Sequence, residues 1–173
     1  MKPGSVEGRA KIAALAVVTL TLQRVLGLPG MPAWFGHLIL PMIWIVAASL
    51  GRKERHWPYE ALLLGLAWDL LLGPVVGPGG IAWTAACLSL YGLASVVADR
   101  SPVAWAAFGA VGAVIVILVQ RLALMPLGLA DYFSISRLVW SAVLTGLWCG
   151  FIGTVLALDL GKHWRAYQVR KLR

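Results

Sequence analysis

Apolar residues dominate this chain in six long runs, which short segments containing Pro, Gly or charged residues separate. The runs cover residues 11–28, 34–50, 57–73, 80–98, 103–124 and 137–160. A hydrocarbon core of about 30 Å needs about 20 helical residues to cross it, so each run matches roughly one transmembrane helix. The pattern predicts an all-α integral membrane protein, with one polytopic domain over residues 1–173, six transmembrane helices and a basic tail over residues 161–173.

Basic residues lie in alternate connections between the runs. The two tails and the second and fourth connections are basic, whereas the first connection (29–33) and the third (74–79) carry no charge. The basic residues are Lys2, Arg9 and Lys11; Arg52, Lys53 and Arg55; Arg100; and Lys162, Arg165, Arg170, Lys171 and Arg173. Because positive residues are retained on the cytoplasmic side, this alternation predicts that both termini are cytoplasmic.

Tryptophans give a second indication of the orientation. Trp34, Trp83 and Trp140 fall near the predicted outer ends of their helices. Indole is amphipathic and favours the headgroup zone of the membrane. We therefore expect these three side chains at the outer interface. Three further tryptophans lie deeper and are expected to pack between helices: Trp44, Trp68 and Trp148.

The composition agrees with a membrane protein and excludes other classes. The chain is 60% hydrophobic and 13% charged, with a mean hydropathy of +0.83, whereas soluble domains carry about 25% charged residues. A net charge of +8 is typical of nucleic-acid-binding proteins when the protein is soluble. Here the positive charge lies in the connections and tails, so it serves orientation, and the expected partner of this charge is the membrane lipid.

Polar side chains inside the predicted helices form a second pattern. An ionised Asp at the bilayer centre costs about 2.5–3.5 kcal/mol, so Asp69 must face protein, water or a partner. By helical rise, Arg24 matches Asp69 best in depth, with Arg121 or a hydrogen bond from Gln23 as alternatives. We therefore predict an outer polar cluster of Gln23, Arg24, Asp69, Gln120 and Arg121. It could be a structural ion pair that fixes helix packing, a ligand or ion site, or a partner-binding site.

Small residues share one face of the third predicted helix. Ala61, Gly65, Asp69 and Gly73 follow each other at intervals of four residues, so they form one stripe. Such stripes let helices approach closely in lipid, so we expect this one to pack against another helix of the chain or of a partner. The Gly- and Pro-rich segment that follows, which includes Gly77, predicts a tight outer turn, because the Lys and Ser or Thr of a phosphate-binding loop are absent.

The residue types of common active sites do not occur together in this sequence. It has no paired carboxylates, no His and Cys spacing typical of metal ligands, and no Ser beside a base. Cys87 and Cys149 lie deep in apolar runs, as small buried hydrophobic residues do. We therefore expect a protein that is not an enzyme and has neither a cofactor nor a metal.

The segment EALLLGLAWDLLLGPVVG, residues 60–77, resembles the central motif of the MreD family of bacterial rod-shape-determining membrane proteins. That motif reads approximately Gly-Leu-x-x-Asp, a short apolar stretch, Gly, a small-residue turn and a further Gly. The matching positions are Gly65, Asp69, Gly73 and Gly77.

The resemblance extends beyond this motif over most of the chain. Gln23 and Pro32 fit the opening helix and first turn of the family, as do the length, the six-span outline and the basic C-terminal end. Two positions depart from the family pattern, because Trp68 replaces an aliphatic residue and Pro74 stands where Ser is common.

This resemblance implies a non-catalytic scaffold of the cell-elongation machinery in the bacterial cytoplasmic membrane. Its expected partner is MreC, which would connect it to RodA, a class B penicillin-binding protein and MreB in the control of cell shape and peptidoglycan synthesis. The implied fold is similar to the substrate-binding subunit of energy-coupling-factor transporters. The alternative function is therefore such a subunit in a micronutrient importer, although the outer loops here are short and mostly apolar.

Overall fold

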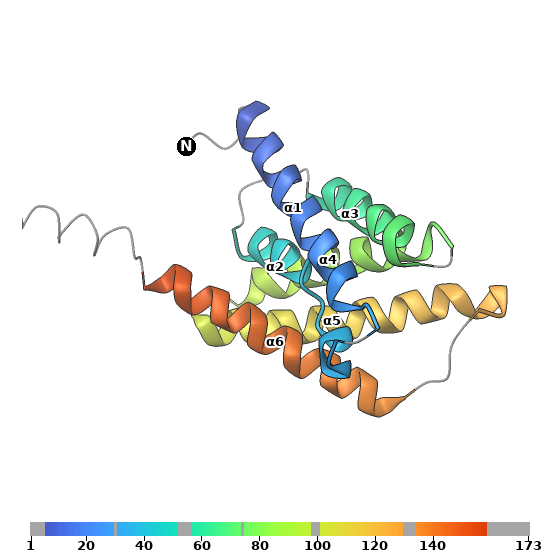
Figure 1. Ribbon diagram of the computed structural model, residues 1–173. Helices are drawn as coiled ribbons and strands as arrows, with labels where there is room; N and C mark the ends of the chain where they lie inside the picture. The colour runs from blue at the N-terminus through green and yellow to red at the C-terminus, as the bar shows by residue number, and fades with distance from the viewer. Residues whose placement is uncertain are drawn as a thin grey trace, which may run out of the picture.

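The computed structural model describes residues 6–29, 31–51, 57–73, 75–97, 101–129 and 134–158. The described residues form helices and connecting turns, without any β-strand. The elements are α1 (Val6–Leu26), η1 (Ala33–His37), α2 (Met42–Gly51), α3 (Trp57–Leu72), α4 (Pro78–Val96), α5 (Pro102–Leu124), η2 (Met125–Leu127) and α6 (Ile135–Ala157) (Figure 1). The predicted all-α class is confirmed for this part of the chain.

Three helical segments are long and apolar enough to cross a membrane. They are α4, α5 together with η2, and α6, at 19, 26 and 23 residues. Large apolar side chains such as Leu88, Leu147 and Phe151 are exposed on them, which suits contact with lipid. The structure therefore supports a membrane protein, while six crossings and cytoplasmic termini stay predictions.

The second apolar run is not one continuous helix, so this part of the prediction for residues 34–50 is wrong, while a membrane crossing by this run stays a prediction. The short helix η1 ends at His37, Leu38 has an extended backbone, and α2 begins only at Met42. Pro41 disfavours a helical conformation at the residue before it but fits the start of a helix, so it explains the interruption. With 10 residues, α2 is about 15 Å long, which is about half of a hydrocarbon core.

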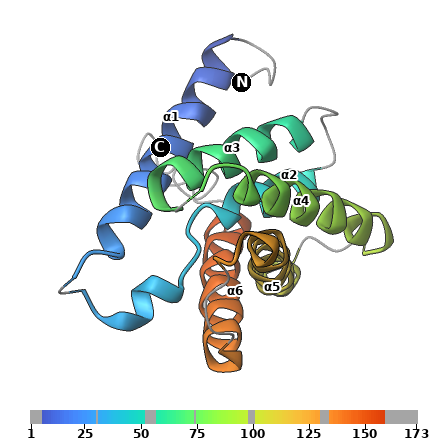
Figure 2. The same ribbon diagram turned by 90° about the vertical axis from the view of Figure 1, so that its right-hand side faces the viewer.

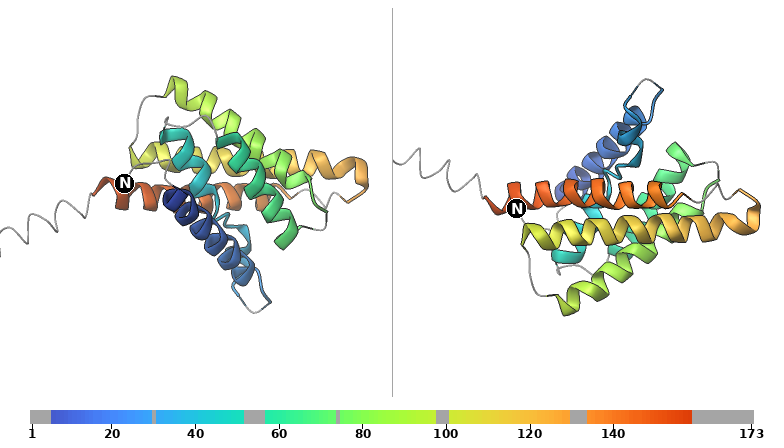
Figure 3. Two further views of the ribbon diagram at one scale, coloured as in Figure 1. Left: turned by 90° about the horizontal axis from the view of Figure 1, so that it is seen from above. Right: turned by 90° about the horizontal axis from the view of Figure 1, so that it is seen from below.

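The helices pack around a central α2. The antiparallel helices α5 and α6 lie side by side, α4 packs on α5, and α3 packs on α4 (Figures 1 and 3). Helix α2 contacts all three of α4, α5 and α6. Helix α1 is strongly inclined to α5 and α6 and lies mainly against α3 and η1 (Figures 1 and 2).

Glycines allow the close approach of α5 and α6. A Cβ atom at Gly146 would lie 2.9 Å from the Ala106 carbonyl oxygen, and one at Gly109 would lie 2.7 Å from the Cys149 Cβ. Neither glycine can be replaced by a larger residue without separating the two helices. The pair is therefore held by small-residue packing of the kind that membrane helices use.

The position of Trp83 differs from the prediction. Its side chain is fully buried and packs against Trp68, with the two ring centroids 5.5 Å apart. Trp83 of α4 and Trp68 of α3 meet where these two helices pack together, so the indole of Trp83 faces protein. Trp34 and Trp140 are 50% and 53% exposed, as residues at an interface would be.

Several predicted features lie outside the described residues. These are the basic connections and tails at Lys2, Arg52, Lys53, Arg55, Arg100 and residues 161–173. The prediction of cytoplasmic termini therefore rests on the sequence alone.

Candidate functional site

The carboxylate of Asp69 holds the turn between α3 and α4. Its Oδ2 atom accepts hydrogen bonds from the backbone N–H groups of Gly77 and Gly79, both at 2.8 Å. Gly77 precedes the first residue of α4 with a φ of 130°, a conformation that favours glycine. The positive end of the α4 dipole lies at the same place. Asp69 thus acts as a cap for α4 that is supplied from the preceding helix.

The predicted ion pair between Asp69 and Arg24 is not formed. Asp69 is 1% exposed, and its Oδ1 atom has no hydrogen-bond partner within the described part of the chain. Arg24 is exposed on α1. The physical reason is local, because two backbone N–H groups and a helix N-terminus already stabilise the buried charge.

The small-residue stripe of α3 packs inside the chain. A Cβ atom on Gly65 would lie 2.5 Å from the Gly79 carbonyl oxygen and 2.8 Å from the Gly80 Cα. Ala61 on the same stripe is 1% exposed. A Cβ on Gly73 would lie 3.0 Å from the Asp69 carbonyl oxygen. Of the two predicted roles, internal packing against α4 is the one observed, so no partner helix can reach Gly65.

Gln23 secures the interrupted segment between η1 and α2. Its Nε2 donates to the Leu38 carbonyl at 2.7 Å, and its Oε1 accepts from the Leu40 N–H at 2.9 Å. Thr145 on α6 accepts a bond from the Ile39 N–H at 3.1 Å. Non-helical backbone is tolerated at membrane depth only where protein or water satisfies it. Gln23 therefore has a structural role in addition to any binding role, and Thr145 is a polar residue that the sequence did not single out.

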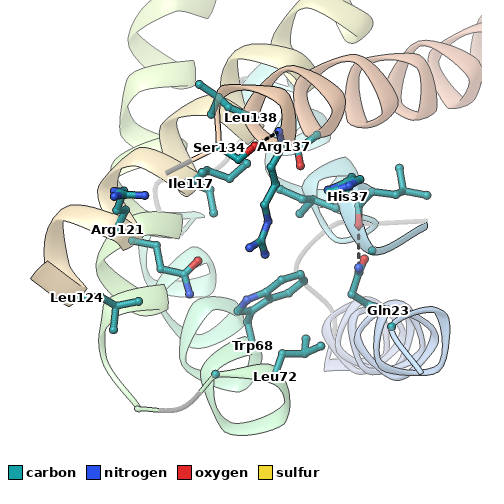
Figure 4. Close-up of a pocket in the computed structure, with 18 of the residues that line it drawn as sticks. Gln23, His37, Trp68, Leu72, Ile117, Arg121, Leu124, Ser134, Arg137 and Leu138 are labelled. Atoms are coloured by element: carbon teal, nitrogen blue, oxygen red, sulfur yellow. Dashed lines mark hydrogen bonds between the residues drawn. The ribbon is translucent and has the colours of Figure 1, made fainter. Parts of the chain in front are cut away.

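A cavity of about 510 Å³ lies where α1, α3 and α5 end and where α6 begins (Figure 4). Three members of the predicted polar cluster line it, namely Gln23, Gln120 and Arg121. Arg24 and Asp69 are not among its lining residues. The other polar or aromatic lining residues are His37, Trp68, Ser134, Arg137 and Ser141. The predicted cluster thus divides into a cavity lining, a buried turn at Asp69 and an exposed Arg24.

The cavity lining is basic. His37, Arg121 and Arg137 come from three different elements, and no Asp or Glu lines the cavity among the described residues. Figure 4 shows the Arg137 side chain pointing into the cavity, toward Trp68. The Nδ1 atom of His37 is buried and has no hydrogen-bond partner in the described ranges. Ligand cavities are commonly about 300–1,000 Å³, so the volume suits a small molecule or a headgroup.

The sequence did not reveal most of this lining. The contribution of His37 depends on the interruption before Met42, and Pro41 was the available signal for it. Arg137 starts the last predicted helix and reaches the cavity only through the packing of α6 on α5. In the part of the chain that the structure describes, no three His, Cys, Asp or Glu side chains gather to hold a metal ion.

Neither a protein-family model, nor a curated protein, nor a solved structure matches this chain.

Proposed function

We propose that this chain is a non-catalytic membrane scaffold of the bacterial cell-elongation machinery that binds an MreC-like partner. The observation that carries the proposal is the set Gly65, Asp69, Gly73 and Gly77, which resembles the MreD motif. In this chain the set forms a single structural unit. Gly65 lets α3 and α4 touch, and Asp69 holds the N-terminus of α4 through Gly77.

This unit favours a scaffold because its residues fix the position of α4 relative to α3. Asp69 and Gly65 are both buried, and the bonds of the Asp69 carboxylate go to the turn of its own chain. A rigid hairpin presents the surrounding apolar surface in a fixed arrangement, which lowers the entropic cost of binding a partner. Because α4 covers Gly65 and the turn before α4 covers Asp69, the proposal assigns partner binding to exposed helix faces.

Co-purification tests the proposed scaffold. The tagged chain is co-expressed with the MreC-like protein and with the energy-coupling-factor core of its own genome, and is then purified in mild detergent. We expect the MreC-like protein at close to one copy per chain, because a scaffold subunit is a stoichiometric component. Recovery of the transporter core instead, or of neither, would contradict the proposal.

The cavity favours one second candidate, the substrate-binding subunit of a micronutrient importer. It combines a volume of about 510 Å³ with aromatic and polar lining residues, as small-molecule sites do. This candidate differs from the scaffold in a measurable way, because the purified chain would then carry a tightly bound vitamin. Mass spectrometry of the extracted small molecules separates the two functions.

A further inference from the structure

Ser141 of α6 is a buried residue whose hydroxyl group forms no hydrogen bond within the described part of the chain. The residue is 3% exposed and lines the cavity. Its Oγ atom is not fully enclosed by protein, so a molecule in the cavity can reach it. Native proteins leave few buried polar groups without a partner, because such a group loses its bonds to water and gains none. The hydroxyl group of Ser141 is therefore available to a ligand.

Other hydroxyl groups in the helices are satisfied by the backbone. Six serine and threonine side chains donate to a carbonyl oxygen in the preceding turn of their own helix, at 2.6–2.9 Å: Thr19, Thr21, Ser49, Thr84, Ser95 and Thr154. This bond satisfies a hydroxyl donor without any contact to another element. Ser141 lies within α6 but does not form it.

Thr145, one turn further along α6, shows the structural use of a hydroxyl group on the same helix face. Thr145 and Ser141 are four residues apart, so their side chains lie one above the other. The hydroxyl oxygen of Thr145 accepts the bond from the Ile39 N–H at 3.1 Å. This bond holds the interrupted segment before α2, whereas Ser141 holds no part of the described backbone.

The cavity has a buried floor and an exposed rim. Ile39, Val116 and Ser141 line it and are 7%, 2% and 3% exposed. Leu129 and Ser134 also line it and are exposed. A molecule that enters at the rim would therefore meet the free hydroxyl group at the floor.

Gln120 of α5 is a second polar side chain that is available in this cavity. It is half-buried, it lines the cavity, and its amide group forms no hydrogen bond within the described ranges. The indole of Trp68 faces the same space (Figure 4) and is supported from behind by Trp83, with the ring centroids 5.5 Å apart. A few free polar groups beside aromatic and aliphatic walls are typical of small-molecule sites.

The free groups indicate the chemistry of the ligand. The hydroxyl group of Ser141 and the amide group of Gln120 can each donate and accept hydrogen bonds. A carboxylate can only accept and an ammonium group can only donate, so neither would use both capacities. A ligand hydroxyl group does both. The best match is therefore an uncharged molecule with several hydroxyl groups on a carbon skeleton, and such a ligand does not depend on the net charge of the lining.

From these observations we infer that the cavity binds an uncharged sugar or polyol, with hydroxyl groups at Ser141 and Gln120 and its carbon skeleton against Trp68. The sugar can be the headgroup of a membrane glycolipid or a soluble molecule. This inference does not depend on the proposed scaffold function, because it rests on the cavity alone.

Native mass spectrometry of the full chain tests this inference. The chain is reconstituted in phosphatidylcholine nanodiscs, and either monoglucosyl diacylglycerol in the nanodisc or soluble methyl glucoside is titrated. We expect one bound glucoside per chain. Binding should be about tenfold weaker for Ser141→Ala and for Gln120→Leu, because each variant loses one hydrogen bond to the ligand.

Ser49→Ala is the matched control. Ser49 is also a buried serine, at 1% exposed, but its hydroxyl group donates to the Ile45 carbonyl at 2.8 Å and it does not line the cavity. This variant should bind the glucoside as the parent chain does. Thermal unfolding without any glucoside gives a second measurement. Ser141→Ala should unfold at the same temperature as the parent or at a higher one, because its hydroxyl group has no bond in the described chain to lose.

The outcomes separate the two sources of the sugar from failure of the inference. Binding of the glycolipid with this pattern of variants supports a lipid headgroup, and binding of methyl glucoside alone with the same pattern supports a soluble sugar. Absence of binding for both probes overturns the inference. Equal affinity of Ser141→Ala and the parent also overturns it. A lower unfolding temperature for Ser141→Ala overturns it as well, because the hydroxyl group would then be engaged within the protein.

Discussion

Gly65→Ala is expected to destabilise the chain strongly and to reduce the yield of folded protein. The added methyl group would lie 2.5 Å from the carbonyl oxygen of Gly79 and 2.7 Å from its carbonyl carbon. These are backbone atoms, so no side chain can rotate away and α3 must move from α4. Overpacking costs about 1–3 kcal/mol, and we expect a value near the top of this range. Thermal unfolding in detergent should show a midpoint about 6–12 °C lower, measured together with the monodisperse yield.

Gly92→Ala is the matched control for this change. Gly92 lies in the same helical hairpin, on α4, and a Cβ atom there would meet nothing within 4 Å. Alanine in a helix interior is favoured over glycine by about 0.5–1 kcal/mol, so this variant should be as stable as the parent or slightly more stable. Equal stability of Gly65→Ala and the parent chain would show that α3 and α4 are not in backbone contact.

Asp69→Ala is expected to have the second large effect. It removes the acceptor of two backbone N–H groups at the start of α4 and leaves the Gly79 N–H buried without its partner. Hydrogen bonds to charged groups contribute about 1.5–3 kcal/mol each, so the loss of both bonds should cost about 3–6 kcal/mol. The stability of Asp69→Asn should lie between that of the parent chain and that of Asp69→Ala, because the amide oxygen of asparagine can still accept a hydrogen bond but carries no charge. Thermal unfolding of the three proteins under one detergent condition measures this order.

The variant Arg24→Gln tests whether Asp69 holds the turn before α4 or forms an ion pair with Arg24. Arg24 is exposed, so its replacement should change stability by less than about 0.5 kcal/mol. A loss as large as that of Asp69→Asn would restore the ion pair as the role of Asp69. The two single variants and the double variant form a thermodynamic cycle, and a coupling energy near zero is expected.

The apolar pattern predicted the long helices well because length and hydrophobicity suffice for them. Helices α5 and α6 begin within about two residues of the predicted starts, and α3 and α4 are similarly close. The prediction of one continuous helix over the second run failed because apolar residues continue through Pro41, whereas the helical conformation is interrupted before it. Gln23 and Thr145 compensate for that break from distant helices, and sequence spacing does not reveal such contacts.

The candidate site was predicted in its residue types but not in its pairings. A buried Asp69 needs a polar partner. An arginine was expected because a sequence shows which side chains are present but not which backbone N–H groups will lie close to the carboxylate. The partners are backbone N–H groups of Gly77 and Gly79, which depend on the turn geometry. Gln23, Gln120 and Arg121 do share one cavity, whereas Arg137 joins it through tertiary packing alone.

The most direct test of the central claim is cell width after depletion of this chain in the bacterium that encodes it. The scaffold function predicts that rods become wider and rounder. The parent chain and Gly92→Ala should restore the rods, whereas Gly65→Ala should not. Normal rods after complete depletion, together with a defect in the uptake of a vitamin, would contradict the scaffold function and support the importer subunit.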